Sequence, residues 1–256
     1  MSTTFRPLAY STLASDCYVR IKEAILNLEL APDAPIDEGQ TAAELGISKT
    51  PVREALARLI GEGFVISGTS RRSFVASLSL QHIREIYQVR IMLETASIRE
   101  ITPRLTEEVL AGLARGVADA ETALTREDLG GFLQANRPFH TSLIECSENR
   151  YLISLARGLF DHARRVNAAI FRVEQRSAQH SLSAQGLAVH RSILDALAAR
   201  DADRAADLIR HDIQLSLDAI STPEMQKAFA ALTYRLDGTR RQLNGKQLVH
   251  AQLGEY

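Results

Sequence analysis

The spacing of hydrophobic residues divides the chain into two regions that predict different elements. In the first 78 residues, apolar positions recur at helical intervals and are interrupted by segments rich in glycine and proline. They predict three helices, at residues 16–30, 39–45 and 51–60. Two β-prone runs flank a polar segment and predict a hairpin, at residues 64–67 and 73–76. Two short helices joined by a tight turn and followed by a hairpin are the plan of a winged helix-turn-helix.

Beyond Leu78 the strand signals end and long amphipathic segments follow one another. They predict six helices, at residues 80–100, 106–125, 129–147, 151–176, 182–199 and 202–220. Helices of this number and length can bury a core of their own in a bundle. The predicted fold is therefore mostly α, with a winged helix-turn-helix and its small β-hairpin wing followed by an all-α bundle. The predicted domains are residues 1–77 and 78–222, with a C-terminal tail at 223–256.

Composition narrows the class of protein without pointing to a ligand. The 256 residues carry a formal net charge of -1 and are 45% hydrophobic, as expected for a packed globular protein. Cys17 and Cys146 are far apart and form no CxxC pair, which argues against a disulfide framework and a cysteine-rich zinc site. The chain does not open on a signal peptide, and no apolar run approaches the roughly 18 residues that cross a membrane. We expect a soluble, cytoplasmic protein.

The start of the third predicted helix carries hydroxyl and cationic side chains suited to DNA. Ser48, Lys49 and Thr50 occupy its N-cap and first turn, and Arg53 follows one turn later. Arginine and lysine donate to guanine O6 and N7 in the major groove, while hydroxyls and helix N-terminal amides hold phosphates. The hairpin tip adds two arginines that would reach the adjacent minor groove or its phosphates. The predicted DNA contacts are Ser48, Lys49, Thr50, Arg53, Arg71 and Arg72.

A purely solvated helix face is the alternative interpretation of these charges. Residues 1–78 hold eight lysines and arginines against nine acidic residues, so this region has no basic excess. The prediction therefore does not depend on net charge. It depends on the positions of the charges and on the combination of the turn, the recognition helix and the wing.

The segment IDEGQTAAELGISKTPVREALARLIGEGFV, residues 36–65, resembles the signature of GntR-type regulators without gaps. In that family a segment similar to S-R-T-P-V-R-E-A-L-x-R-L forms the recognition helix. The resemblance implies DNA contacts at Ser48, Lys49, Thr50 and Arg53. The chain departs from the family at Gly39, where an arginine that contacts DNA is frequent, and at Ser73, where the wing usually has glycine. These departures bear on affinity and operator sequence and leave the class of protein unchanged.

Three histidines in the helical region are spaced so that they can meet. Asn136 and His140 are four residues apart and share a helix face. His190 and His211 lie 11 and 10 residues on either side of Asp201, which sits in a turn between two helices. Each therefore stands about 15 to 16 Å from the turn, at the same height in an antiparallel pair. Three imidazoles and one oxygen suit a divalent first-row metal such as Zn²⁺ or Ni²⁺, with positions left for water or a carboxylate.

Residues 80–220 resemble the FCD domain of one GntR subfamily, whose metal site has an Asp-x3-His pair on one helix and two later histidines. The matching segments are residues 139–140, 146–149 and 189–196. Asn136 stands in place of the usual aspartate and is neutral. Because Pro138 removes a helical hydrogen bond, a helix beginning there would make Asn136 a capping residue instead of a ligand. A further alternative is that the histidines are unrelated, and are either hydrogen-bonded in the core or exposed.

Arg90 and His162 are the candidate contacts for a small effector. The apolar stripe around Arg90 places its charge on the inward face of a helix, where a guanidinium needs an anion. That anion is either Glu94, one turn away, or the carboxylate of an effector held by two parallel hydrogen bonds. His162 lies on an apolar stripe of its own helix, where it either lines the same cavity or is a core histidine with a satisfied hydrogen bond.

Together these patterns predict a homodimeric transcription regulator, more in keeping with a repressor than an activator. It would bind palindromic operator DNA and be released by a small organic acid bound near the metal. The alternative is a regulator for which the metal itself is the signal. Metal-assisted hydrolysis would need a general base beside the metal, and the four-residue steps from His140 and His190 provide none. We therefore expect no enzymatic activity.

Overall fold

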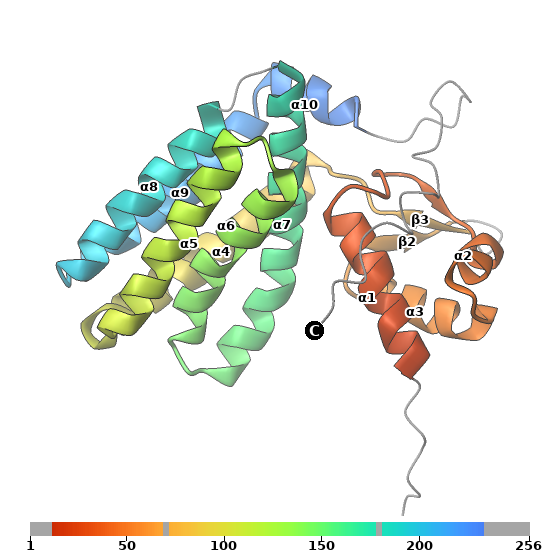
Figure 1. The fold of residues 1–256 in the computed structure, drawn as a ribbon, viewed down its shortest axis with the longest axis horizontal. Helices are drawn as coiled ribbons and strands as arrows, with labels where there is room; N and C mark the ends of the chain where they lie inside the picture. The colour runs from red at the N-terminus through yellow and green to blue at the C-terminus, as the bar shows by residue number, and fades with distance from the viewer. Residues whose placement is uncertain (1–11, 69–71, 178–180, 233–256) are drawn as a thin grey trace, which may run out of the picture. The chain divides into compact units, whose positions relative to one another are not determined.

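The fold was analysed in a computed structural model, shown in Figure 1. It describes residues 12–68, 72–177 and 181–232. The chain divides into two compact units. The N-terminal unit includes residues 12–25 and 29–77, and the helical unit consists of residues 26–28 and 78–232. No helix of the described residues is long and apolar enough to cross a membrane.

The N-terminal unit has the order of elements that the sequence predicts, with one strand added. Its elements are α1 (Thr12–Leu26), β1 (Pro35–Ile36), α2 (Glu38–Leu45), α3 (Lys49–Gly61), β2 (Val65–Ser67) and β3 (Ser73–Val75). The sheet is antiparallel in the order β1-β3-β2, and Ile36 and Ser67 both pair with Ser73. Strand β1 has only two residues, too few for an alternating pattern, which is why the sequence did not reveal it.

Local chemistry explains where the helices of this unit end. Asp37 caps α2 by accepting a hydrogen bond from the Gln40 amide, and Gly46 ends it in the left-handed conformation at φ 66°. Helix α1 stops at Leu26, earlier than the predicted end at residue 30. There the amides of Glu29 and Leu30 both bond to the Ala24 carbonyl, which closes the helix in a turn.

The helical unit is a bundle whose long helices match the six predicted ones. Its elements are α4 (Leu80–Ile101), a 3-10 turn (Thr102–Arg104), α5 (Glu107–Thr125), α6 (Leu129–Glu145), α7 (Arg150–Ser177), α8 (Ser181–Ala198), α9 (Ala202–Ile220) and α10 (Pro223–Ala230). Helix α4 packs against α6, α7 and α9, while α8 packs against both α5 and α9. The inward faces form one hydrophobic core, with Ile101, Phe171, Ile193 and Ile209 at 0% exposure. The functional side chains of this unit lie at the centre of that packing.

Helix α10 lies inside the segment predicted to be a tail. Thr222 caps it by accepting a hydrogen bond from the Met225 amide, and Pro223 occupies its first turn. Phe229 is buried, and α10 packs against α7 and α9. Its eight residues are too few for a clear helical period, so its place in the core was not apparent from the sequence. Residues 233–256 of the predicted tail lie outside the described residues.

Candidate functional site

The first turn of α3 presents the predicted DNA-contacting side chains to solvent. Ser48 is the N-cap residue by its backbone (φ -77°, ψ 167°), but its hydroxyl makes no capping hydrogen bond. Ser48, Lys49 and Thr50 are exposed, whereas Val52 and Leu56 are buried on the opposite face. The helix therefore separates an inward packing face from an outward polar one, and its hydroxyls and amides at the N-terminus are available to an anion.

Arg53 and Lys49 each lie close to a residue of α2. Arg53 Nε donates to Glu38 Oε2 at 2.6 Å, in a pair whose arginine side chain is 62% exposed. An exposed pair of this kind is weak and easily exchanged for a base or phosphate. A side chain on Gly39 would come within 3.3 Å of the Lys49 Cε and Nζ atoms. Gly39 therefore leaves space for the Lys49 side chain. This is the local effect of having glycine where the family often has arginine.

A backbone hydrogen bond between the ends of β2 and β3 lies at a position where glycine is needed. The Gly68 amide donates to the Arg72 carbonyl at 2.7 Å. A Cβ atom at Gly68 would lie 2.5 Å from the Phe74 ring, so a side chain there would force a rearrangement. Ser73 is a paired strand residue and is 8% exposed. Arg72 is exposed, and Arg71 lies outside the described residues.

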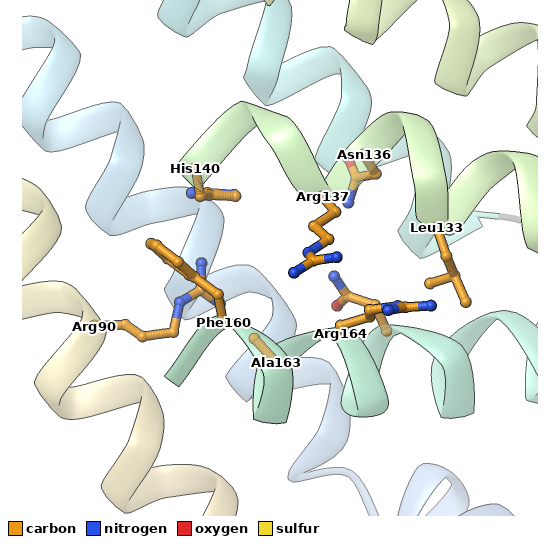
Figure 2. A pocket seen from close by; sticks show the side chains of 9 residues that line it. Arg90, Leu133, Asn136, Arg137, His140, Phe160, Ala163 and Arg164 are labelled. Atoms are coloured by element: carbon orange, nitrogen blue, oxygen red, sulfur yellow. The ribbon is translucent and has the colours of Figure 1, made fainter. Parts of the chain in front are cut away.

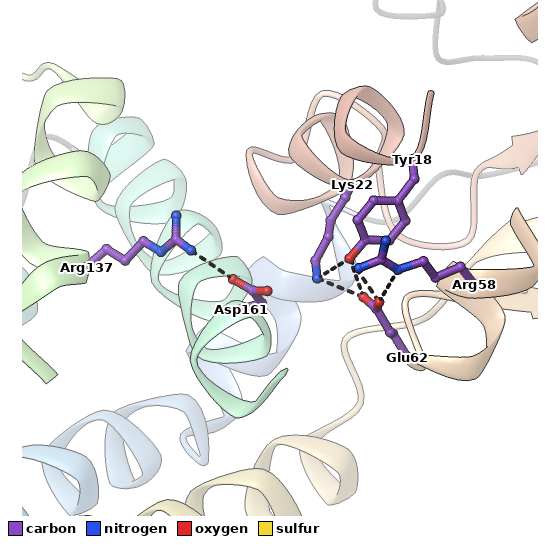
Figure 3. Close-up of polar contacts among 6 residues, drawn as sticks. All are labelled: Tyr18, Lys22, Arg58, Glu62, Arg137 and Asp161. Atoms are coloured by element: carbon purple, nitrogen blue, oxygen red, sulfur yellow. Dashed lines mark hydrogen bonds and ion pairs between the residues drawn. The ribbon is translucent and has the colours of Figure 1, made fainter. Parts of the chain in front are cut away.

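A cluster of Tyr18, Lys22, Arg58 and Glu62 joins α1 to the end of α3 (Figure 3). Tyr18 donates to Glu62, and Lys22 Nζ lies 2.7 Å from Glu62 Oε2. The Arg58 guanidinium stacks 3.6 Å from the centre of the Tyr18 ring. Burial opposes ionisation of Glu62, but Lys22, Tyr18 and Arg58 outweigh it and lower the pKa of its carboxyl. The sequence did not reveal this cluster, which attaches the C-terminal end of the recognition helix α3 to α1.

In the helical unit, His140 on α6, His190 on α8 and Asp212 on α9 converge. One ligand atom from each lies within 4.8 Å of the other two. His140 Nε2 is 3.3 Å from Asp212 Oδ2, and His190 Nε2 is 3.5 Å from Asp212 Oδ1. His190 and Asp212 are buried, and the His140 side chain is 11% exposed. Three helices thus direct two imidazoles and a carboxylate at one point.

Asp212 takes the place that the sequence argument had assigned to His211, which is exposed and outside the group. The distance from the turn placed the ligand at the correct height on α9, but neighbouring residues of a helix point in directions about 100° apart. The inward face of α9 is marked by Ala205, Ile209 and Ile213. Asp212 falls on this face and His211 does not, so the apolar stripe was the signal that would have chosen between them.

Asn136 and His140 share one face of a continuous helix. Helix α6 begins at Leu129, with Asp128 as its cap, and runs through Pro138 to Glu145. The alternative in which a helix begins at Pro138 and Asn136 caps it is therefore wrong. Asn136 is half-buried and lines the same pocket as His140.

Glu94 links the metal group to Arg90. Arg90 Nε donates to Glu94 Oε1 at 2.7 Å, which is the local partner that the sequence offered as an alternative to an effector. Glu94 Oε2 lies 2.6 Å from His140 Nδ1. Burial alone would lower the pKa of His140, but Glu94 and Asp212 beside it raise that pKa to about 9. Burial likewise opposes the ionisation of Asp212, and the two histidines outweigh it and lower the pKa of its carboxyl.

The donor set fits a divalent metal ion. A hydrogen bond from His140 Nδ1 to Glu94 would leave Nε2 as the lone-pair donor facing Asp212, as in carboxylate-histidine-metal arrangements. His190 Nδ1 is buried and has no hydrogen-bond partner in the described part of the chain. Two imidazoles and a carboxylate are ligands that first-row divalent metals accept.

A small pocket, partly open to solvent, lies beside the metal group (Figure 2). It is lined by Arg90, Leu133, Asn136, Arg137, His140, Phe160, Ala163, Arg164 and Asn167. His162 is not among these residues. It is half-buried, and its ring meets the edge of the His82 ring at a centroid distance of 5.1 Å. Of the two predicted effector contacts, the structure therefore brings Arg90 to the pocket and not His162.

Known proteins resemble the chain over both units. The family profile for bacterial regulatory proteins of the gntR family matches residues 13–75, and that for the FCD domain matches residues 85–215. An uncharacterized HTH-type transcriptional regulator in an unstable DNA locus of Streptomyces ambofaciens is 29% identical over 219 residues, covering 80% of this chain and 84% of that relative. The HTH-type transcriptional repressor RspR of Escherichia coli is 26% identical over 198 residues, covering 77% and 84%. The solved structure of E. coli McbR/YncC has a similar fold, with a TM-score of 0.71 at 20% identity over 82% of this chain and 98% of that chain.

Proposed function

Because the chain belongs to the GntR family of bacterial regulatory proteins and is a DNA-binding transcriptional regulator and not an enzyme, we propose that it is a homodimeric, cytoplasmic repressor. Its operator would be a palindrome with half-sites about one helical turn apart or closer. A small organic acid bound beside a metal ion would release it. A relative at 26% identity is named as a repressor, which supports the sign of regulation.

One observation carries the DNA-binding surface: Ser48, Lys49 and Thr50 are exposed in the first turn of α3, while the opposite face of that helix is buried. Arg53 extends the same face, held only by an exposed ion pair. We assign base contacts to Lys49 and Arg53, phosphate contacts to Ser48 and Thr50, and minor-groove contacts to Arg71 and Arg72.

The test is operator binding by wild type and an Arg53→Ala variant, after selection of bound fragments from genomic DNA. We expect the variant to lose about 1 to 3 kcal/mol of operator binding and to relax specificity at one base pair. Fluorescence anisotropy on operator variants measures both effects. The exposed Arg115 on α5 provides a matched control, since Arg115→Ala should bind as wild type does. A uniform loss across all operator variants would contradict a base contact by Arg53.

Homodimer formation is supported by apolar side chains exposed on the helical unit. Val89 and Met92 of α4 are 41% and 68% exposed. Neighbouring exposed apolar side chains of this kind can contribute to an interaction surface. A second subunit packed on this helix would set the spacing of two recognition helices, and an effector acts by binding one spacing more tightly than another. Light scattering of the purified protein should give twice the mass of the chain; a monomer at operator-binding concentrations would contradict this part of the proposal.

We further propose that His140, His190 and Asp212 hold Zn²⁺ or Ni²⁺, with Asn136 as an additional oxygen ligand. The buried donor group and its Glu94 partner support this assignment. The metal would offer a coordination position to a carboxylate, while the protein orients the ligands and restricts water. We expect His190→Ala to bind operator normally but to lose bound metal, measured by elemental analysis after dialysis, and to lose its response to effectors. Unchanged metal content would exclude the role of His190.

A regulator that responds to the metal itself is the second candidate, favoured by the convergence of three ligands that the chain itself supplies. Operator binding should be followed while the metal is added alone and then with small carboxylates. Release by metal alone supports this alternative, and release that requires a carboxylate supports the effector model.

A further inference from the structure

We propose that Phe139 is a positioning residue for the metal group, and that its ring holds the His190 imidazole in the orientation that binds a divalent ion. This inference rests on the proposed function, in which His140, His190 and Asp212 hold the metal. It adds that the two imidazoles are held in place by different forces, a hydrogen bond for His140 and aromatic stacking for His190.

The two histidines of the metal group differ in what contacts their Nδ1 atoms. His140 Nδ1 lies 2.6 Å from Glu94 Oε2, and this contact fixes the rotation of the ring. His190 Nε2 lies 3.5 Å from Asp212 Oδ1, but its Nδ1 atom is buried and has no hydrogen-bond partner among the described residues. Histidines that bind metals almost always donate their second ring N–H to a carboxylate, a carbonyl or water. Among the described groups, His190 therefore lacks the contact that usually orients such a ring.

The Phe139 ring constrains His190 by stacking on its face. The centres of the two rings are 4.0 Å apart, and their planes differ by only 9°. Both residues are buried. An imidazole turned edge-on to a phenyl ring needs a separation of about 5 Å between the ring centres. At 4.0 Å, His190 can therefore not turn edge-on without displacing Phe139, so the stacked ring restricts the direction of Nε2.

Phe139 is itself held in place by the core and by its position in the chain. It precedes His140 on α6, and the edge of one ring meets the face of the other at a centroid distance of 5.5 Å and an angle of 80°. Phe139 also belongs to the hydrophobic core of the bundle. The rings of His140 and His190 lie 5.1 Å apart at 73°. One phenylalanine thus contacts both imidazoles, and α6 supplies one ligand as well as the support for the ligand on α8.

Core packing alone is the competing explanation for a buried phenylalanine, so the test needs a matched core variant. Phe139→Leu removes the flat ring and keeps an apolar side chain. Phe132→Leu is the control, because Phe132 is buried on the same helix and packs on Phe171, away from the metal group. Urea denaturation of the full-length protein measures the stability that each variant loses. If Phe139→Leu does not fold, Phe139→Met takes its place, since it retains more of the side-chain volume.

Zinc affinity and a cobalt spectrum distinguish positioning from packing. In chelator competition, Phe139→Leu should weaken zinc binding about tenfold or more, as loss of a group that orients a ligand does, and Phe132→Leu should change it by less than about twofold. With Co²⁺ as the probe, the visible absorption reports ligand geometry, and it should change in Phe139→Leu alone. In the metal-free protein with ¹³C-labelled histidine, the His190 ring protons should be shifted upfield by the stacked phenyl face, and Phe139→Leu should remove that shift.

The wild-type protein separates failure of this inference from failure of the proposed function. If wild type binds zinc and Phe139→Leu binds it equally, with an unchanged cobalt spectrum, the positioning role is wrong and the metal site stands. Equal weakening of zinc binding by Phe132→Leu would likewise assign the effect of Phe139 to core packing. If wild type binds neither zinc nor cobalt, the metal part of the proposed function fails and this inference fails with it, while the DNA-binding part is unaffected.

Discussion

The N-terminal unit and the helical unit place their functional side chains in opposite environments. In the N-terminal unit, Ser48, Lys49 and Thr50 are consecutive, exposed and presented by the start of one helix. In the helical unit, His140, His190 and Asp212 come from three helices and meet in the interior. The first arrangement depends on one helix and the turn that precedes it. The second depends on the packing of the whole bundle.

The ion pairs of the two units show the same contrast. Arg53 and Glu38 form an exposed pair, with 62% and 26% of their side chains accessible, whereas Arg90 and Glu94 are 6% and 4% accessible. Water solvates the first pair if it breaks, so the arginine can exchange its partner for DNA at little cost. The second pair has no such alternative, because an unpaired charge in the bundle would lack both solvent and partner. A surface that must bind and release needs the first kind, and a site that must hold its geometry needs the second.

The largest expected effect is a difference between the two ion pairs in their contribution to the free energy of unfolding. We expect Glu94→Ala to lower the free energy of unfolding by about 3 to 5 kcal/mol, because it leaves the Arg90 guanidinium buried without its carboxylate. The matched variant Glu38→Ala should lower it by about 1 kcal/mol or less. Urea denaturation followed by circular dichroism measures both. Equal costs for the two variants would show that the burial contrast does not govern the strength of these pairs.

The second effect concerns which residue of α9 belongs to the metal group. Asp212→Asn should weaken zinc binding by more than about 100-fold, since loss of even an outer-shell partner costs about 10- to 100-fold. His211→Ala, one residue away and exposed, should change zinc affinity by less than about twofold in the same chelator competition. If the histidine variant loses the metal and the asparagine variant retains it, the interior assignment is wrong.

The smallest effect compares two serines at helix starts. The Ser79 hydroxyl accepts a hydrogen bond from the His82 amide and caps α4, whereas the Ser48 hydroxyl makes no capping bond on α3. We expect Ser79→Ala to cost about 1 kcal/mol of stability and leave operator binding unchanged. Ser48→Ala should cost less than about 0.5 kcal/mol of stability but weaken operator binding about fivefold through a lost phosphate contact. A Ser48 variant that is destabilised with normal operator binding would make Ser48 a structural cap.

The fold was largely predictable because its signals are local. The six long helices of the bundle and the two strands of the hairpin follow from hydrophobic spacing and from capping and turn residues. Strand β1 and helix α10 were not predicted, because two residues and eight residues are too few to establish a hydrophobic period. The end of α1 was placed too late, because the closing turn at Glu29 and Leu30 carries apolar residues that prolong the helical pattern.

The candidate site was predictable only in part. His140 and His190 were identified, because a four-residue spacing and distances from a turn are properties of individual helices. Glu94 was considered only as a partner of Arg90, and its contact with His140 joins residues 46 positions apart. Arg137 and Arg164, which line the pocket, carry no sequence signal that distinguishes them from solvated surface charges.

By itself, the sequence determined the order of the elements, the polar face of the recognition helix and the heights at which ligands stand along their helices. Each of these follows from bonds and periodicities within a few residues. Only the tertiary structure decided that Asp212 and not His211 faces the interior, that Pro138 lies within a continuous helix, and that Glu94 meets His140. The reason is that a helix's rotation about its own axis is set by which face its neighbours bury, and this depends on the packing of all the helices at once.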